Sequence, residues 1–419
     1  MHRIIRKNYF SGSLRQRYWD AAAFWAEVMA LFQSRNKAFR GVVVRNQLRF
    51  AFSAVTPIAG ETAERARAGV DWILRGQAAT NDDGVSLGYF PCDNGAQNGW
   101  RASYPETTGY IITTLLAFAK QFKDPAVAAA AMRMVEWEMA VQMPSGAVQG
   151  GPVCAPERQT AAAFNTGMVL DGWCSAFAHS GDARVFNAAR SAADFLVSDL
   201  DERGYFKTNG AFVSAGEIKT YTCLCAWAIY RFGELAGADS YRQVAVGIIE
   251  SALRQQQPNG WFAHNCLTHS ESPLTHTIGY TLQGVLEVGI LAGRSDFVAA
   301  VRRTVDAIAP RIAGSGYLPG RFYADWEPAG FSSCLTGSAQ IAIVCYRLAE
   351  HANEEKYHTL ADKLVDYLKA LQLVKAEDAS TVGSIAGSFP LFGGYMRAGY
   401  PNWATKYYLD ALRLQEARR

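Results

Sequence analysis

From about residue 60 onward, the chain repeats one pattern of apolar and polar positions six times. An apolar stretch leads through a turn and a polar loop to a second apolar stretch. In the clearest copy, residues 258–287, the turn is Asn259-Gly260, and Gly takes the positive φ that a tight reversal needs. Beyond the loop, Ile278, Leu282 and Leu286 recur at helical spacing, which places them on one buried stripe. The pattern therefore predicts six helical hairpins.

Two kinds of marker define the six copies. The predicted turns between outer and inner helices are Gly88-Tyr89-Phe90, Ser145-Gly146, Gly204-Tyr205-Phe206, Asn259-Gly260, Gly316-Tyr317-Leu318 and the segment 383–392. The predicted inner helices are entered at Thr107, Thr166, Thr220, Thr277, Thr336 and Thr405, about 55 to 70 residues apart. Asp124, Asp182, Asp239 and Asp296 open outer helices and are expected to cap them. One hairpin cannot bury its apolar face alone, so the copies must stack.

The last copy indicates how the stack ends. A linear solenoid needs polar terminal caps, whereas the final helix carries Trp403, Tyr407, Tyr408 and Leu412. We therefore predict an all-α fold for residues 59–419, an (α/α)6 toroid of six helical hairpins with short β-turn and strand insertions in the loops. The six loops before the inner helices then emerge on one face, and their polar residues surround a funnel.

Residues 1–58 do not share the repeat. Residues 18–32 hold Trp25, Val28 and Phe32 at helical spacing, and residues 35–49 are basic with apolar interruptions. We expect a helical extension packed on the toroid. A membrane-surface or partner-binding segment is the alternative.

Composition narrows the functional classes. Hydrophobic residues make up 49% of the chain and charged residues 19%, as in a globular protein with a large core. The net charge of +3 gives no reason to expect a nucleic-acid partner. Eight Cys without a secretion signal or a transmembrane-length apolar run predict a cytoplasmic protein. No phosphate-loop or nucleophile-elbow motif is present, and no cofactor is expected.

Carboxyl groups at the predicted funnel suggest glycoside hydrolysis, which uses two carboxyls on either side of a sugar. Asp93 or Glu106 of the first copy is expected to supply one. Asp325 or Glu327 of the fifth copy is expected to supply the other, from across the ring. The competing interpretation is that these acids cap helices or pair with neighbouring bases.

A second candidate chemistry removes a proton beside a uronate carboxylate, as a polysaccharide lyase or uronyl epimerase does. The candidate bases are Tyr104, Tyr221, His264, His276 and Tyr400, with His276 and Tyr221 preferred. Aromatic, basic and amide side chains are expected to bind the acidic saccharide in either case. These predicted substrate-binding residues are Trp100, Arg101, Tyr104, Arg158, Asn165, Lys219, His264, Arg321, Tyr323, Trp326, Arg397, Tyr400 and Asn402.

Two further alternatives stay open. A non-catalytic saccharide-binding or scaffold protein for polysaccharide biosynthesis would show the aromatic and basic groups without the catalytic ones. A zinc site at His264, Cys266, His269 and His276 has suitable ligand types, but the spacing matches no zinc motif.

The repeated Gly-Tyr-Phe or Gly-Trp-Phe turn before an inner helix resembles the six-hairpin glycosidase-like superfamily. The final helix, from Tyr400-Pro401-Asn402-Trp403 onward, resembles that of uronyl C5-epimerase-like toroids. These resemblances imply an α/α toroid acting on carbohydrate, with an acidic poly- or oligosaccharide as substrate and hydrolysis favoured over elimination or epimerisation. The segment 255–261 also resembles the Gln-Trp repeats of terpene cyclases, but the Asp-x-Asp-Asp motif of the squalene cyclases is absent.

Overall fold

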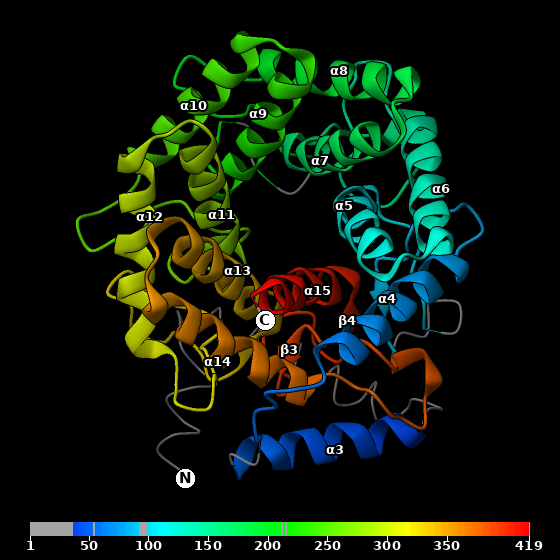
Figure 1. Cartoon of the computed structure of the whole chain (residues 1–419), viewed down its shortest axis with the longest axis vertical. Coiled ribbons are helices and arrows are strands. Elements are labelled where there is room, and N and C mark those ends of the chain that lie inside the picture. Colours follow the sequence, from blue (N-terminus) through cyan, green and yellow to red (C-terminus); the bar gives the residue numbers. More distant parts are fainter. Residues whose placement is uncertain (1–36, 53–54, 92–98, 211–212, 214–215, 419) are drawn as a thin grey trace.

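Six helical hairpins follow one another around a ring in the computed structural model, which describes residues 37–52, 55–91, 99–210, 213 and 216–418 (Figure 1). The outer helices are α4 (Thr62–Ala78), α6 (Pro125–Val141), α8 (Ala183–Ser198), α10 (Asp239–Leu253), α12 (Ser295–Ile308) and α14 (Glu355–Leu371). The inner helices are α5 (Pro105–Phe122), α7 (Ala163–Ser180), α9 (Cys225–Ala236), α11 (Thr275–Leu291), α13 (Leu335–Ala352) and α15 (Asn402–Ala417). The predicted all-α toroid is confirmed.

Short 3-10 helices and strands interrupt the loops. The 3-10 helices are η1 (Pro156–Arg158), η3 (Thr220–Leu224), η4 (Ala309–Arg311) and η5 (Ala379–Thr381). The strands β1 (Gly88–Tyr89) and β4 (Tyr400–Pro401) pair antiparallel, as do β2 (Ser333–Cys334) and β3 (Ser388–Phe389). The first of these pairs joins the loop of hairpin one to that of hairpin six, so the two ends of the repeat meet.

The turn glycine of each hairpin packs on the outer helix of the next hairpin. Its neighbours are Ser191 of α8 for Gly146, Ser251 of α10 for Gly204, Thr304 of α12 for Gly260, Lys363 of α14 for Gly316, and Ala68 of α4 for Gly383. All five glycines have φ between 83° and 95°. A Cβ on Gly316 would lie 2.0 Å from the Lys363 carbonyl oxygen, and one on Gly383 equally close to that of Ala68. Glycine is needed here for both its conformation and its size.

Hairpin one departs from the sequence prediction. Gly84, not Gly88, faces the next outer helix, with a Cβ position 2.7 Å from Trp137 of α6. Gly88 instead lies in β1, where a Cβ would meet the Tyr400 carbonyl oxygen of β4. The prediction chose Gly88 because Tyr89 follows it, whereas Gly84 is followed by Val85 and carries no aromatic marker.

The repeated threonines bind the loops to the inner helices. The hydroxyls of Thr166 and Thr405 accept hydrogen bonds from the backbone N–H groups of Val148 and Ile385, at 2.8 and 3.0 Å. In hairpin one the equivalent residue is Thr108, which accepts from Val85 at 3.0 Å, rather than the predicted Thr107. These bonds satisfy buried N–H groups immediately after the turn.

Glycines within the inner helices allow close helix contacts. A Cβ on Gly109 of α5 would lie 2.5 Å from the Val169 Cα of α7, and one on Gly337 of α13 would lie 2.6 Å from the His276 backbone N of α11. Any larger residue at these positions would push neighbouring inner helices apart.

Capping of the outer helices is only partly as predicted. Asp124 and Asp182 accept hydrogen bonds from backbone N–H groups at the starts of α6 and α8. Asp239 and Asp296 lie inside the first turns of α10 and α12, where neither serves as the N-cap. Their charge still opposes the positive end of each helix.

Ion pairs and a hydrogen bond join inner helices to one another away from the loops. α7 is joined to α9 by Asp171–Arg231, α11 to α13 by Glu287–Arg347 at 2.8 Å, and α5 to α15 by the Thr114 hydroxyl on Asp410 at 2.9 Å. The Asp171 and Glu287 side chains are buried, so an unpaired charge there would be costly.

Helix α3 (Lys37–Ala51) lies outside the ring, beside α14 and the loops of hairpins five and six (Figure 1). Arg49 donates to the Ala370 carbonyl oxygen at 3.0 Å, and the Leu391 N–H donates to the Asn46 side chain at 2.8 Å. Phe50 packs edge-on against Phe331 and Phe389. No helix in the described ranges is long and apolar enough to cross a bilayer.

The turn-glycine contact is testable by a matched pair of substitutions. Gly316→Ala adds a Cβ against a backbone carbonyl at positive φ, and we expect the free energy of unfolding to fall by about 3 kcal/mol. Gly293→Ala is the control, because Gly293 also has positive φ but no neighbour within 4 Å. Only the conformational cost of about 1 kcal/mol is expected there. Denaturant unfolding measures the free energy of unfolding of both variants. Equal losses in the two variants would contradict a role for the contact at Gly316.

Candidate active site

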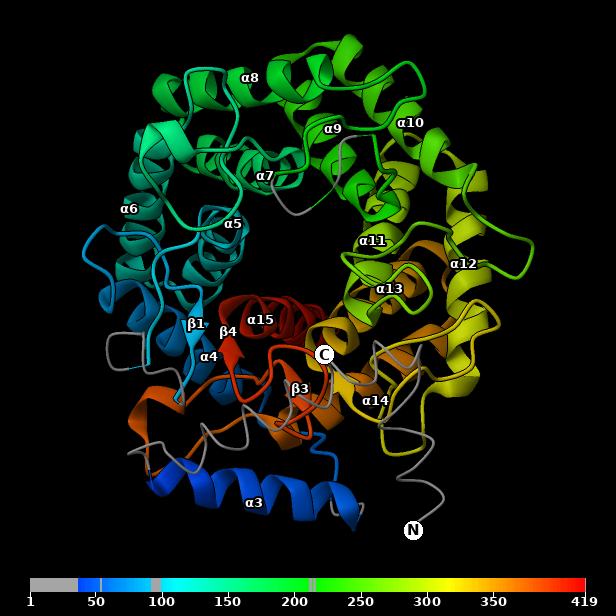
Figure 2. The same cartoon turned by 180° about the vertical axis from the view of Figure 1, so that it is seen from behind.

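The loops before the inner helices lie on one face of the ring, the face toward the viewer in Figure 2. A cavity of about 1000 Å³ opens among them. Its lining comes from the loops of hairpins one to four and six, from η3, and from the first two turns of α5, α7, α11 and α15. This cavity therefore corresponds to the funnel on which the loop residues were predicted to converge.

Glu106 is the most perturbed acid in the described cavity lining. It lies in the first turn of α5, just after Tyr104 and Pro105, and part of its side chain faces the cavity. Burial of the carboxyl raises the pKa of Glu106 to about 7, although a hydrogen bond from Tyr104 favours the ionised form. A carboxyl with this pKa can both donate and accept a proton near neutral pH.

Tyr104 holds this carboxyl in place. Its hydroxyl bonds to Glu106 and also interacts with the Asn165 side chain and the Gly151 backbone. Asn165 is in turn fixed by a 2.9 Å hydrogen bond to the Gln149 carbonyl oxygen. Burial and the neighbouring Glu106 raise the pKa of Tyr104 above its usual value, so the phenol stays protonated.

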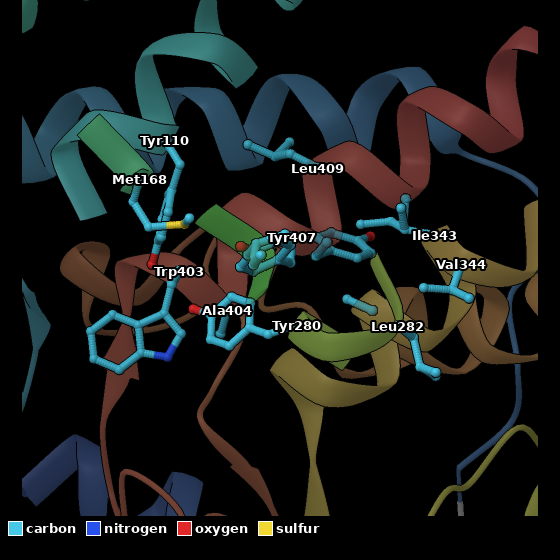
Figure 3. Close-up of a cluster of buried hydrophobic side chains, with 14 of the residues drawn as sticks. Tyr110, Met168, Tyr280, Leu282, Ile343, Val344, Trp403, Ala404, Tyr407 and Leu409 are labelled. Carbon is cyan, nitrogen blue, oxygen red and sulfur yellow. The ribbon is translucent and has the colours of Figure 1, made fainter. Parts of the chain in front are cut away.

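An aromatic cluster lies beside the cavity, and its members Tyr280 and Trp403 line the cavity. Tyr110, Tyr280 and Tyr407, from α5, α11 and α15, turn toward one another beside Trp403 (Figure 3). Ring centroids of Tyr407 lie 5.6 Å from Tyr110 and 5.8 Å from Tyr280. Burial raises the pKa of all three phenols, so these rings present neutral, electron-rich faces.

His276 lies in this aromatic cluster as a neutral base. Its ring is 4.4 Å from Tyr280 and 5.4 Å from Tyr395, and Nδ1 bonds to Gln340 Oε1 at 2.9 Å. Burial lowers the pKa of His276 to about 4, against which the bond to Gln340 acts only partly. Because Oε1 is an acceptor, Nδ1 carries the proton and Nε2 keeps a lone pair.

Seven of the predicted site residues line this cavity. They are Trp100, Arg101, Tyr104, Glu106, Asn165, Tyr221 and His276. Trp100 packs on Trp72 and Tyr89, while the Arg101 guanidinium lies 4.0 Å from the centre of the Phe90 ring. The structure thus brings together the predictions from hairpins one to four, except for Arg158, Lys219 and His264, and for Asp93, which lies outside the described residues.

Arg158, Lys219 and His264 are outside the lining. Arg158 is exposed in η1, and His264 is exposed with φ of 56° while its carbonyl accepts from Thr220. Lys219 is buried and pairs with Glu217 at 2.7 Å. It also donates to the Leu267 carbonyl oxygen at 3.0 Å, so it braces the loop that follows α10.

Asp325 and Glu327 do not face Glu106. Both are exposed at a turn of hairpin five, where Asp325 accepts from the Glu327 N–H at 3.0 Å and Glu327 pairs with Arg311 at 2.6 Å. The expected carboxyl pair across the ring is therefore not assembled by these residues. Asp93 lies outside the described residues.

The remaining candidates from hairpins five and six make structural contacts. Trp326 is buried against Trp261, and its indole N–H donates to the Asn259 carbonyl oxygen at 3.0 Å. Asn402 donates to the Ser86 carbonyl oxygen and the Thr107 hydroxyl, both at 2.8 Å, which fastens α15 to hairpin one. The other four, Arg321, Tyr323, Arg397 and Tyr400, likewise lie outside the cavity lining.

Sequence reasoning missed several lining residues. Phe164, Tyr280, Tyr395 and Trp403 surround the space above Glu106, and Asp82 contributes a second carboxyl. Asp82 accepts from the Ser103 hydroxyl at 2.5 Å and from the Gly84 N–H at 3.1 Å. Two of the aromatic residues had a usable signal, since Phe164 and Trp403 lie in the first turns of inner helices.

Within the described ranges, no group of three or more His, Cys, Asp or Glu side chains is placed to hold a metal ion. Cys266 instead lies 3.8 Å from the Lys219 ammonium, and its neighbour His264 is exposed. The described residues of this region therefore form loop contacts rather than a zinc ligand set.

No protein-family model and no curated protein matches the sequence. Solved structures do match. A heparin-specific unsaturated glucuronyl hydrolase superposes with a TM-score of 0.69 at 14% identity, covering 85% of this chain and 97% of that one. The unsaturated glucuronyl hydrolase of Bacillus sp. GL1 gives 0.68 at 16% identity, covering 85% and 97%.

A D-mannose isomerase superposes almost as well, with a TM-score of 0.66 at 11% identity over 85% of this chain and 98% of that one. All three are toroids of six helical hairpins. The comparison therefore confirms the predicted α/α toroid fold for this chain.

Proposed function

We propose that this protein is a glycoside hydrolase that acts on an acidic oligosaccharide, with Glu106 as its acid and base. The observation that carries the proposal is Glu106 itself, a carboxyl with a pKa of about 7 in an aromatic cavity large enough for a short saccharide. A purely saccharide-binding protein has no need for such a group.

In the proposed reaction, the protonated Glu106 carboxyl gives its proton to the glycosidic oxygen as the bond from that oxygen to the sugar carbon breaks. Positive charge develops on the sugar ring, and the neutral faces of Tyr280, Tyr395 and Trp403 are suited to stabilise it. Water then adds to the sugar carbon and returns a proton to Glu106. Tyr104 keeps the carboxyl oriented through both steps.

Proton abstraction by a tyrosine is less well supported. Burial raises the pKa of Tyr221 well above its usual value, and the nearby Glu106 raises it further, so the phenolate that an elimination needs is disfavoured. His276 is neutral and remains a possible base for elimination or epimerisation. Hydrolysis through Glu106 is therefore the first choice, and a lyase or epimerase reaction is the second.

An acidic substrate is supported by two considerations. Arg101 is the one Lys or Arg among the described cavity-lining residues, and its guanidinium is suited to a sugar carboxylate. The structures with similar folds include hydrolases described as specific for heparin and as responsible for glycosaminoglycan degradation. One fold supports many reactions, so the substrate is assigned to this chain as a proposal.

The acid role of Glu106 predicts a loss of turnover on substitution. Glu106→Gln should lower kcat by a factor of about 100 or more, since the amide cannot donate a proton. In the unaltered protein, kcat/KM should fall as the pH rises through about 7, where Glu106 loses its proton. Steady-state assays on uronate-containing oligosaccharides measure both. Reducing ends report hydrolysis, and ultraviolet absorbance of unsaturated uronates reports elimination.

Glu157→Gln is the matched control, because Glu157 is exposed in η1 and outside the cavity lining. It should leave turnover unchanged. An active Glu106→Gln variant would exclude Glu106 as the acid. A rise in unsaturated uronate would favour the lyase reaction instead.

Burial of Glu106 also predicts a pH-dependent stability. Because its pKa is raised from 4.5 to about 7, the folded state loses stability relative to the unfolded chain as the pH rises between these values. Glu106→Gln removes this loss. Its thermal midpoint should exceed that of the unaltered protein above pH 7 and match it near pH 4. If the variant and the unaltered protein have equal thermal midpoints both near pH 4 and above pH 7, burial does not raise the pKa of Glu106.

The proposed substrate charge is tested at Arg101. Arg101→Gln should raise KM for an acidic oligosaccharide by about tenfold with little change in kcat, because a ground-state ion pair is lost. Arg158→Gln, an exposed arginine outside the cavity lining, is the control. An unchanged KM for Arg101→Gln would remove the basis for an acidic substrate at this position.

A further inference from the structure

We propose that helix α3 docks this protein on an anionic phospholipid surface. The proposal concerns the outer face of α3, away from the cavity, and does not depend on the proposed hydrolase reaction.

One face of α3 already has a partner. Val43 is buried, Arg49 and Asn46 bond to the backbone at Ala370 and Leu391, and Phe50 packs among aromatic rings. These contacts fix the orientation of the helix relative to the toroid. The opposite face is therefore presented outward by the fold.

That outward face is apolar. Val44, Leu48 and Phe52 are 57%, 51% and 74% exposed. Their spacing of four residues places them in one row along the helix, and the Phe52 N–H still bonds to the Leu48 carbonyl oxygen at 3.0 Å. Scattered exposed apolar residues are ordinary, but a row of three on one helix forms a continuous edge.

Positive charge accompanies this row. Arg45 is exposed beside it. Residues 1–52 contain ten Lys and Arg against two Asp and Glu, a net charge of +8, whereas residues 53–419 contain 31 against 36. The net positive charge of the chain therefore comes from residues 1–52, of which residues 1–36 lie outside the described part of the structure. A helix that can insert apolar side chains and also carries basic residues binds well to the interface of an anionic lipid membrane.

Other occupants fit less well. A nucleic acid or an acidic polysaccharide would pair with the arginines but would gain little from burying Leu48 and Phe52. In a symmetric dimer, the basic segments of two copies would repel each other. A single row of three side chains is also small beside the roughly 800 Å² that each partner buries in a stable interface.

The test uses the full chain and co-sedimentation with vesicles. Vesicles of phosphatidylcholine with about a third phosphatidylserine should bind the protein, and pure phosphatidylcholine vesicles should bind it far less. The double variant Leu48→Ser/Phe52→Ser should lower the partition coefficient at least about tenfold, because it removes the inserted apolar surface. Arg45→Glu should lower it roughly fivefold or more.

Leu235→Ser is the matched control, since Leu235 is 37% exposed at the end of α9 and away from α3. It should bind vesicles like the unaltered protein. Thermal midpoints of all variants should agree, because the substituted side chains are exposed. The proposal is overturned if anionic vesicles fail to bind the full chain, or if the double variant binds them as well. It is also overturned if heparin, but not vesicles, binds, or if the double variant changes only the oligomeric state.

Discussion

The structure depends on one repeated contact, in which the turn of each hairpin meets the outer helix of the next hairpin. At Gly316 and Gly383 this contact is so close that a single methyl group would collide with a carbonyl oxygen. The contact fixes the position of each hairpin relative to the next. Because the turn of the sixth hairpin contacts α4 of the first hairpin, the six hairpins form a closed ring. Closure removes the exposed apolar ends that an open stack would leave.

The ring then determines the chemistry of the cavity. Inner helices begin on the same face, so their first turns gather aromatic side chains around Glu106. Burial among these rings, rather than a neighbouring charge, raises the pKa of that carboxyl and lowers that of His276. The same packing that closes the toroid thus prepares a proton donor. Tyr104 and Asn165 keep it aligned through hydrogen bonds to adjacent loops.

Helix α3 adds a second function to the scaffold without changing the ring. Its inner face packs against α14 and the loops of hairpins five and six, where it covers aromatic residues such as Phe331 and Phe389. Its outer face keeps an apolar row beside positive charge. A rigid attachment of this kind would hold the toroid at a defined orientation to an anionic surface.

The sequence alone determined the architecture. Six recurrences of turn, loop and threonine-marked helix identify the hairpins, and the aromatic last helix indicates closure, because both depend on local spacing and on burial of apolar stripes. The tertiary structure alone decided which polar residues share a cavity. Glu106 and His276 come together across four hairpins, whereas Asp325 and Glu327 lie exposed beside Arg311. Glu106 lies on an inner helix, whereas Asp325 and Glu327 lie in a loop turn. Sequence spacing records neither the rotation of that helix nor the path of that loop, so the carboxyls look alike until the hairpins are packed.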